Sequence, residues 1–107
     1  MHFDQGDIIE VDFDPTLGHE PQKRRPALVV SSNEFNHATS MTIVCPITSQ
    51  VNGFFLHEPL PPHLRMQGEV VMEQVRALDL EARGAKKVAA LDQAELEPIL
   101  ICLRSFF

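Results

Sequence analysis

Residues 6–32 read GDIIEVDFDPTLGHEPQKRRPALVVSS, and this stretch decides how the chain begins to fold. Residues 9–13 alternate apolar and acidic side chains, which predicts a half-buried strand with an acidic outer face. Residues 26–30, PALVV, form a continuous apolar run that is typical of a more completely buried strand. Residues 19–25 contain a histidine, a glutamate and three cations, and we expect them to form an exposed loop between the two strands. Loops held by a rigid scaffold often carry functional sites, so polar chemistry is expected here.

A further strand is predicted from residue 41 to residue 48. Ile43 and Ile47 share one face of it, whereas Thr48 points away from that face at the strand's end, where its hydroxyl can serve a site. Pro46 indicates that this end is not part of a fully paired central strand.

The remaining elements are expected to be short. They are a loop with one helical turn, a strand, a proline-rich loop and another strand, at residues 31–40, 53–57, 58–63 and 87–90. Residues 69–78 look extended, but the apolar alternation slips near Glu73 and Gln74, which predicts a bulge.

A C-terminal helix is predicted from its start signal and its apolar stripe. Asp92 and Glu95 resemble a capping box, and apolar residues recur at helical spacing from Leu96 to Leu103. Pro98 is expected to kink this helix or delay its start. Short strands with one terminal helix predict a mostly-β α+β fold, and the length of 107 residues predicts a single domain over 1–107.

Composition indicates where in the cell the protein is expected and in which state its cysteines are. No run approaches the roughly 18 apolar residues of a membrane span, and no basic and apolar leader opens the sequence, so we expect a cytoplasmic protein with no membrane contact. Cys45 and Cys102 lie among apolar residues without metal-binding spacing, and we interpret them as buried free thiols.

The net charge of −6 is unevenly distributed. Residues 1–20 contain six acidic side chains and no Lys or Arg, whereas seven of the nine cations lie within residues 23–25 and 76–87. Such local patches can bind phosphates on an acidic protein, while the acidic remainder weakens non-specific binding to nucleic acid.

Four ordered blocks, residues 6–30, 35–36, 46–49 and 73–84, carry motifs of a known family. In these blocks the chain resembles the MazF/PemK (Kid-type) family of bacterial toxins. The resemblance implies an SH3-like barrel with a C-terminal helix, a homodimer, a cognate antitoxin protein as partner, and endoribonuclease activity without a cofactor or metal.

The resemblance also assigns candidate catalytic residues. Arg25 takes the place of the family's catalytic arginine, and a guanidinium can stabilise the negative charge that grows on a phosphate during RNA cleavage. Thr48 matches a threonine that can donate to a phosphate oxygen. Glu20 either accepts the 2′-OH proton or pairs with Arg25, and Glu73 stands where Kid-type members carry an aspartate thought to act as base. Val71 replaces an arginine of that branch, which shifts weight to Arg25 and Thr48.

Further residues are candidates for RNA binding. They are His19, Lys23, Arg24, Ser49, Phe54, Gln74, Arg76, Arg83 and Lys86. Phe54 or Phe55 can stack on an unpaired base. The alternating Asp12 and Asp14 fit a strand face better than a metal site, and His57, like the other scattered histidines, receives no role.

The function these signals favour is a type II toxin that cleaves single-stranded RNA sequence-selectively and without metal. One alternative on the same fold is a CcdB-like toxin that poisons DNA gyrase by binding it. Another is a catalytically inactive homologue that binds only RNA or an antitoxin. Fold alone does not choose between these functions.

Overall fold

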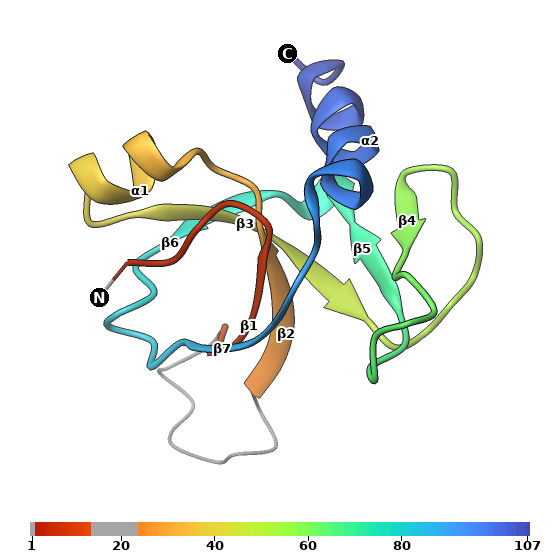
Figure 1. Ribbon diagram of the computed structural model, residues 1–107, viewed down its shortest axis with the longest axis horizontal. Coiled ribbons are helices and arrows are strands. Elements are labelled where there is room, and N and C mark those ends of the chain that lie inside the picture. Colours follow the sequence, from red (N-terminus) through yellow and green to blue (C-terminus); the bar gives the residue numbers. More distant parts are fainter. Residues whose placement is uncertain (1, 14–23) are drawn as a thin grey trace.

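The architecture is a curved antiparallel sheet with a helix packed across it (Figure 1). The structure is a computed structural model and describes residues 2–13 and 24–107. In chain order the strands are β1 (Asp7–Asp12), β2 (Arg24–Val29), β3 (Thr42–Thr48), β4 (His57–Pro59), β5 (Glu69–Val71), β6 (Arg76–Leu78) and β7 (Lys86–Ala90). The helices are α1 (Asn33–Ala38), the 3₁₀ helix η3 (Met72–Gln74) and α2 (Gln93–Arg104).

Strand β3 is the centre of the sheet, whose order is β4-β5-β3-β2-β1-β7. Along one edge β3 pairs with β2; along the other it pairs first with β6, over 42–44, and then with β5, over 47–48. Pro46 lies in the central strand but coincides with the gap between β6 and β5, so this end of β3 is not fully paired, as expected. The missing N–H is tolerated at a position where one neighbour has ended and the next has not begun.

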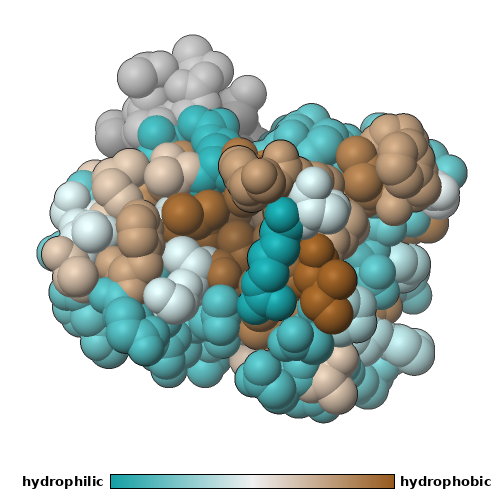
Figure 2. All heavy atoms as spheres, turned by 90° about the horizontal axis from the view of Figure 1, so that it is seen from above, coloured by the Kyte–Doolittle hydropathy of each residue, from teal (hydrophilic) through white to brown (hydrophobic). Residues whose placement is uncertain are grey.

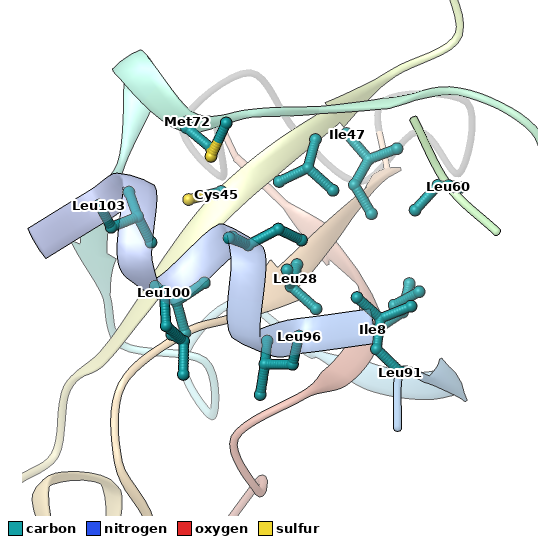
Figure 3. Close-up of a cluster of buried hydrophobic side chains, with 13 residues drawn as sticks. Ile8, Leu28, Cys45, Ile47, Leu60, Met72, Leu91, Leu96, Leu100 and Leu103 are labelled. Atoms are coloured by element: carbon teal, nitrogen blue, oxygen red, sulfur yellow. The ribbon is translucent and has the colours of Figure 1, made fainter. Parts of the chain in front are cut away.

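The core occupies both faces of the sheet. Because successive side chains of a strand point to opposite faces, the fully buried Ile8 and Ile9 enter two different clusters. Figure 3 shows the first cluster, in which Leu96, Leu100 and Leu103 of α2 face Ile8, Leu28 and the other labelled side chains of the sheet. Glu10 on β1 is exposed, as the predicted acidic outer face requires, whereas Asp7 at the start of the strand is buried and forms an ion pair of 3.2 Å with Lys87.

Helix α2 begins where its sequence signal predicts. The Asp92 side chain accepts from the Glu95 N–H at 2.8 Å, and the Glu95 carboxylate accepts from the Asp92 N–H at 3.0 Å, which completes the capping box. Pro98 lies inside the helix without delaying its start. The predicted mostly-β α+β fold with a C-terminal helix is confirmed.

Several boundaries differ from prediction. Arg24 and Arg25 belong to β2 and not to a loop, because they pair with Asp12 and Val11 of β1. The strand predicted at 53–57 lies at His57–Pro59, so it takes the start of the predicted proline-rich loop. The interruption near Glu73 is real, but it is the 3₁₀ turn η3 and not a bulge.

The surface retains some large apolar side chains (Figure 2, viewed from the end at which α2 projects). Val51, Phe55 and Phe107 are the most exposed of them. Within residues 2–13 and 24–107, no helix has the length and apolar character needed to cross a membrane. Cys45 is buried, Cys102 is partly buried, and both are free thiols, as predicted.

Candidate active site

Four of the predicted site residues meet in one open pocket of about 360 Å³. Arg25 comes from the start of β2, Thr48 from the end of β3, and Glu73 and Gln74 from η3. The other lining residues are Pro46, Ile47, Gln50, Asn52, His57 and Val71. Strand β5 pairs with the end of β3 that carries Thr48, and η3, with Glu73 and Gln74, follows β5 directly before the chain returns to β3 as β6.

Arg25 is exposed, and its position is fixed by the backbone ladder between β1 and β2. No hydrogen bond or ion pair joins its guanidinium to any residue in the described ranges, although it lines a pocket containing a carboxylate. A cation held on a strand, with its donors unused by these residues, suits binding of an anionic ligand.

Thr48 is half-buried at the end of β3. Its Oγ1 accepts from the N–H of Gln50 at 3.1 Å, and the hydroxyl hydrogen remains for an acceptor in the pocket. Gly68 approaches this strand end so closely that a Cβ at residue 68 would lie 2.4 Å from the Thr48 carbonyl oxygen.

Glu73 is held by a histidine to which the sequence analysis gave no role. His57 Nε2 lies 3.1 Å from Oε2 of Glu73, and His57 Nδ1 lies 3.1 Å from Oε1 of Glu69. Glu69 is buried at 1% exposure, and its carboxylate also accepts from the N–H groups of Asn52 and Gly53, both at 3.2 Å.

This cluster shifts two pKa values in opposite directions. Burial by itself would lower the pKa of His57, but the hydrogen bonds and charges of Glu73 and Glu69 raise it above its ordinary value. Burial would raise the pKa of Glu69, but the bonds from Asn52, His57 and Gly53 lower it below its ordinary value. Both shifts favour the charged forms.

Sequence reasoning missed His57 and Glu69. Glu69 did carry a signal, since a carboxylate beside the apolar run Val70–Met72 has to find a partner when that run is buried. The partner was hidden because it depends on the pairing of β4 with β5, which places His57 opposite Val71.

Arg24 and Arg83, two of the predicted RNA-binding residues, do not line the pocket. Arg24 donates to the carbonyls of Glu10 at 3.0 Å and Gly84 at 2.6 Å, and Arg83 donates to those of Asp12 at 3.2 Å and Phe13 at 2.7 Å. These bonds fasten the end of β1 to the turn before β7. The structure therefore places both arginines outside the pocket lining and gives each a structural role.

Two further cations also lie outside the pocket lining. The Arg76 guanidinium lies 5.6 Å from the Phe13 ring centre, and the exposed Lys86 pairs in register with Glu10. Of the other RNA-binding candidates, Ser49 is exposed directly after β3, and Phe54 is 42% exposed with its ring 5.2 Å from that of His57. Glu20, His19 and Lys23 lie outside the described residues.

The described residues that line the pocket include one carboxylate, that of Glu73, and no thiol. Burial, with smaller effects of Glu73 and Cys102, raises the pKa of Cys45 to about 12, so that this thiol stays protonated. In the part of the chain that the structure describes, no three His, Cys, Asp or Glu side chains are grouped so that they could hold a metal ion.

An exposed cation, a hydroxyl and a carboxylate around one open pocket, on a curved β-sheet with a C-terminal helix, define a candidate phosphate-cleaving site. The chain matches the model of the PemK-like, MazF-like toxins of type II toxin–antitoxin systems over residues 4–107. It therefore belongs to this family, as its motifs predict.

Relatives and solved structures agree with this assignment. The chain is 40% identical to the endoribonuclease toxin ChpB of Escherichia coli K12 over 108 residues, covering 96% of this chain and 92% of ChpB. It is 38% identical to the endoribonuclease toxin MazF of the same strain over 96 residues, covering 90% of this chain and 86% of MazF. A crystal structure of MazE–MazF (Form-II) from Deinococcus radiodurans matches with a TM-score of 0.84 and 30% identity, covering 99% of this chain and 95% of that chain.

These matches confirm the predicted class. The protein is a toxin of the endoribonuclease family and an enzyme by that membership, and the gyrase-poisoning and inactive alternatives are not favoured.

Proposed function

We propose that this protein cleaves single-stranded RNA by attack of a ribose 2′-OH on the adjacent phosphorus, with Arg25, Thr48 and Glu73 as the reacting site. The observation that carries the proposal is that these three side chains, from three separate segments, line the same open pocket. In this reaction the 2′-oxygen bonds to phosphorus and the P–O5′ bond breaks. The products are a 2′,3′-cyclic phosphate and a 5′-OH.

Arg25 and Thr48 are assigned to the phosphate. Negative charge on the non-bridging oxygens increases as the fifth oxygen approaches phosphorus, so a fixed cation binds the transition state more tightly than the ground state. Arg25 supplies that cation, and the hydroxyl of Thr48 donates to one of the same oxygens.

Glu73 is assigned to the 2′-OH proton. Its side chain is 35% exposed, His57 occupies Oε2, and no described residue bonds Oε1. Oε1 can accept the 2′-OH proton, while the 5′-oxygen takes a proton from solvent water as it leaves. Glu20 is the second candidate for the same transfer and lies outside the described residues.

A single strand is the substrate that suits this surface. Phe54 and Phe55 are 42% and 80% exposed beside the pocket, and such aromatic rings can stack on unpaired bases. Gln50, Asn52 and Gln74 add polar groups that can read base edges, which supports sequence-selective cleavage. Messenger RNA in the cytoplasm offers such single strands.

Cleavage is expected to proceed in excess EDTA, because the nucleophile is part of the RNA and needs no metal-bound water. The purified protein is incubated with a long RNA in EDTA, and the ends of the fragments are read by mass spectrometry. Fragments ending in 2′,3′-cyclic phosphate and 5′-OH are expected. Loss of cutting in EDTA with recovery in Mg²⁺ would contradict the mechanism.

We also propose a homodimer. The PALVV run and the apolar stripe of α2 lie largely in the core of the single chain. What remains is an apolar depression lined by Ile43, Val75, Leu100, Leu103 and Phe107, with Phe107 97% exposed. Association that covers such a patch removes apolar area from water.

Light scattering at micromolar concentration is expected to give twice the mass of the chain. A Phe107→Ser variant should dissociate more readily, because it removes apolar surface only from this patch. A wild-type protein that stays monomeric at this concentration would refute the dimer.

An antitoxin protein is the proposed regulatory partner. Solved structures similar to this chain include MazE–MazF of Deinococcus radiodurans. A partner segment that covers the Arg25 pocket with acidic or apolar side chains would exclude RNA from it.

A further inference from the structure

His57 is enclosed between two carboxylates, one buried and one at the pocket. Glu69 on β5 faces Nδ1, Glu73 on η3 faces Nε2, and the Phe54 ring packs edge-on against the imidazole at 5.2 Å. Besides Glu73 and His57 itself, the only charged group among the described residues that line the pocket is Arg25 on β2. Cys45 of β3, the residue before Pro46, stays a neutral thiol. The side chain of His57 is only 8% exposed, so water contributes little to holding the ring.

The two contacts together fix the charge of the ring. A neutral imidazole has a single N–H and could donate to only one of the two carboxylates. Because both nitrogens face carboxylate oxygens at 3.1 Å, the arrangement requires an imidazolium when Glu69 and Glu73 are ionised. The two backbone N–H groups that bond Glu69 favour its ionised form.

The two carboxylates respond differently if the ring loses its proton. Glu69 has a side chain only 2% exposed and cannot replace its histidine bond by water, whereas Glu73 is 35% exposed and can. The neutral ring therefore keeps its hydrogen on Nδ1 for Glu69 and turns a lone pair toward Glu73. The carboxylate of the pocket is thus the one that loses its partner.

We propose that His57 is a positioning residue of the RNA-cleaving site, which holds Glu73 in place and ties it through Glu69 to the Asn52–Gly53 backbone. This inference rests on the proposed function, because it assigns His57 to act through the proposed base. It makes the base and the loop that borders the pocket one connected unit: Glu73, His57, Glu69 and the backbone of residues 52–53.

The connection gives activity and stability a defined pH dependence. The raised pKa of His57 means that its contribution to stability is complete below 6.5 and is lost as the pH rises through the raised value. The lowered pKa of Glu69 means that its contribution is complete above 4.5 and is lost as the pH falls through the lowered value. The charged forms of His57 and Glu69 are therefore both fully present between pH 4.5 and pH 6.5. As the pH rises further, His57 loses a proton and no longer holds Glu73.

The test uses His57→Gln, Glu73→Gln, the double variant, and His63→Gln as matched control. His63 also contacts a glutamate, Glu95 at 2.5 Å, but it is 61% exposed and does not line the pocket. Each protein cleaves a short single-stranded RNA containing one mapped cleavage site, and kcat and KM are measured against pH.

Glu73→Gln should lower kcat by about 10²–10⁴-fold, as loss of a general base does. His57→Gln should lower kcat by about 10–100-fold, the effect of misplacing a catalytic group, with a smaller change in KM. The double variant should be no slower than Glu73→Gln alone, since His57 acts through Glu73. His57→Gln should also lose the alkaline decline of the wild type, and His63→Gln should match the wild type throughout.

An independent measurement is the NMR titration of the His57 ring nitrogens, which needs no RNA. The wild-type ring should stay doubly protonated above its ordinary pKa, and Glu73→Gln should lower that pKa. Unchanged kcat in His57→Gln, or losses that multiply in the double variant, would overturn the inference. A neutral ring at a pH below 6.5 would overturn it even if His57→Gln fails to fold. A wild type that cuts no RNA would instead refute the proposed function, while the titration still reports on the cluster.

Discussion

Replacing Arg25 by alanine is expected to abolish RNA cleavage and growth inhibition while the fold remains intact. Arg25 is exposed, and its strand is held by backbone pairing, so the substitution removes a charge from the pocket and little from the core. Loss of one well-placed charge stabiliser costs about 10²–10³ in rate. The measurements are kcat on a single-stranded RNA, growth of cells expressing the variant, and thermal unfolding.

Two companion variants sharpen this result. Arg25→Lys should recover little activity, because an ammonium lacks the planar fork that binds two phosphate oxygens. Arg65→Ala removes another exposed arginine, one that does not line the pocket, and should leave cleavage unchanged. If Arg25→Ala stays toxic in cells, RNA cleavage at this pocket is not the toxic activity. If it unfolds, the role of Arg25 is structural.

Replacing Gly68 by alanine is expected to cause a large loss of stability and to damage the active site at the same time. Gly68 has a φ of +147°, which L-residues rarely adopt, and the new Cβ would lie 2.4 Å from the Thr48 carbonyl oxygen. Backbone strain and overpacking each cost about 1–3 kcal/mol, so their sum is about 2–6 kcal/mol. Urea unfolding measures the free energy of unfolding.

The folded fraction of Gly68→Ala should also cleave RNA more slowly. Relief of the collision has to move β5 or the end of β3 that carries Thr48, and a displacement of about 1 Å in a site can cost about 10²-fold in rate. Gly53→Ala is the matched control: its φ is +71°, but nothing lies within 4 Å of the added Cβ. It should lose only about 1–2 kcal/mol of stability from strain. Equal losses in the two variants would show that contact with Thr48 is unimportant.

The sequence alone was sufficient for the features that depend on local pattern. Apolar alternation predicted strands β1 and β3, and the reciprocal signals of Asp92 and Glu95 predicted the start of α2, since a capping box involves only residues three apart. The family motifs identified Arg25, Thr48 and Glu73 as candidate catalytic residues, and these three side chains line one pocket.

What local pattern could not supply was the pairing of distant strands. Strand pairing makes Arg25 part of β2 and places Pro46 in the central strand. The same pairing brings Arg24 and Arg83 to backbone carbonyls, to which both donate hydrogen bonds. It also brings His57 against Glu69 and Glu73 through the register of β4 with β5. The physical reason is that register is set by the burial of whole faces and by the geometry of turns, whereas a charged side chain shows its partner only after the strands that carry both have been aligned.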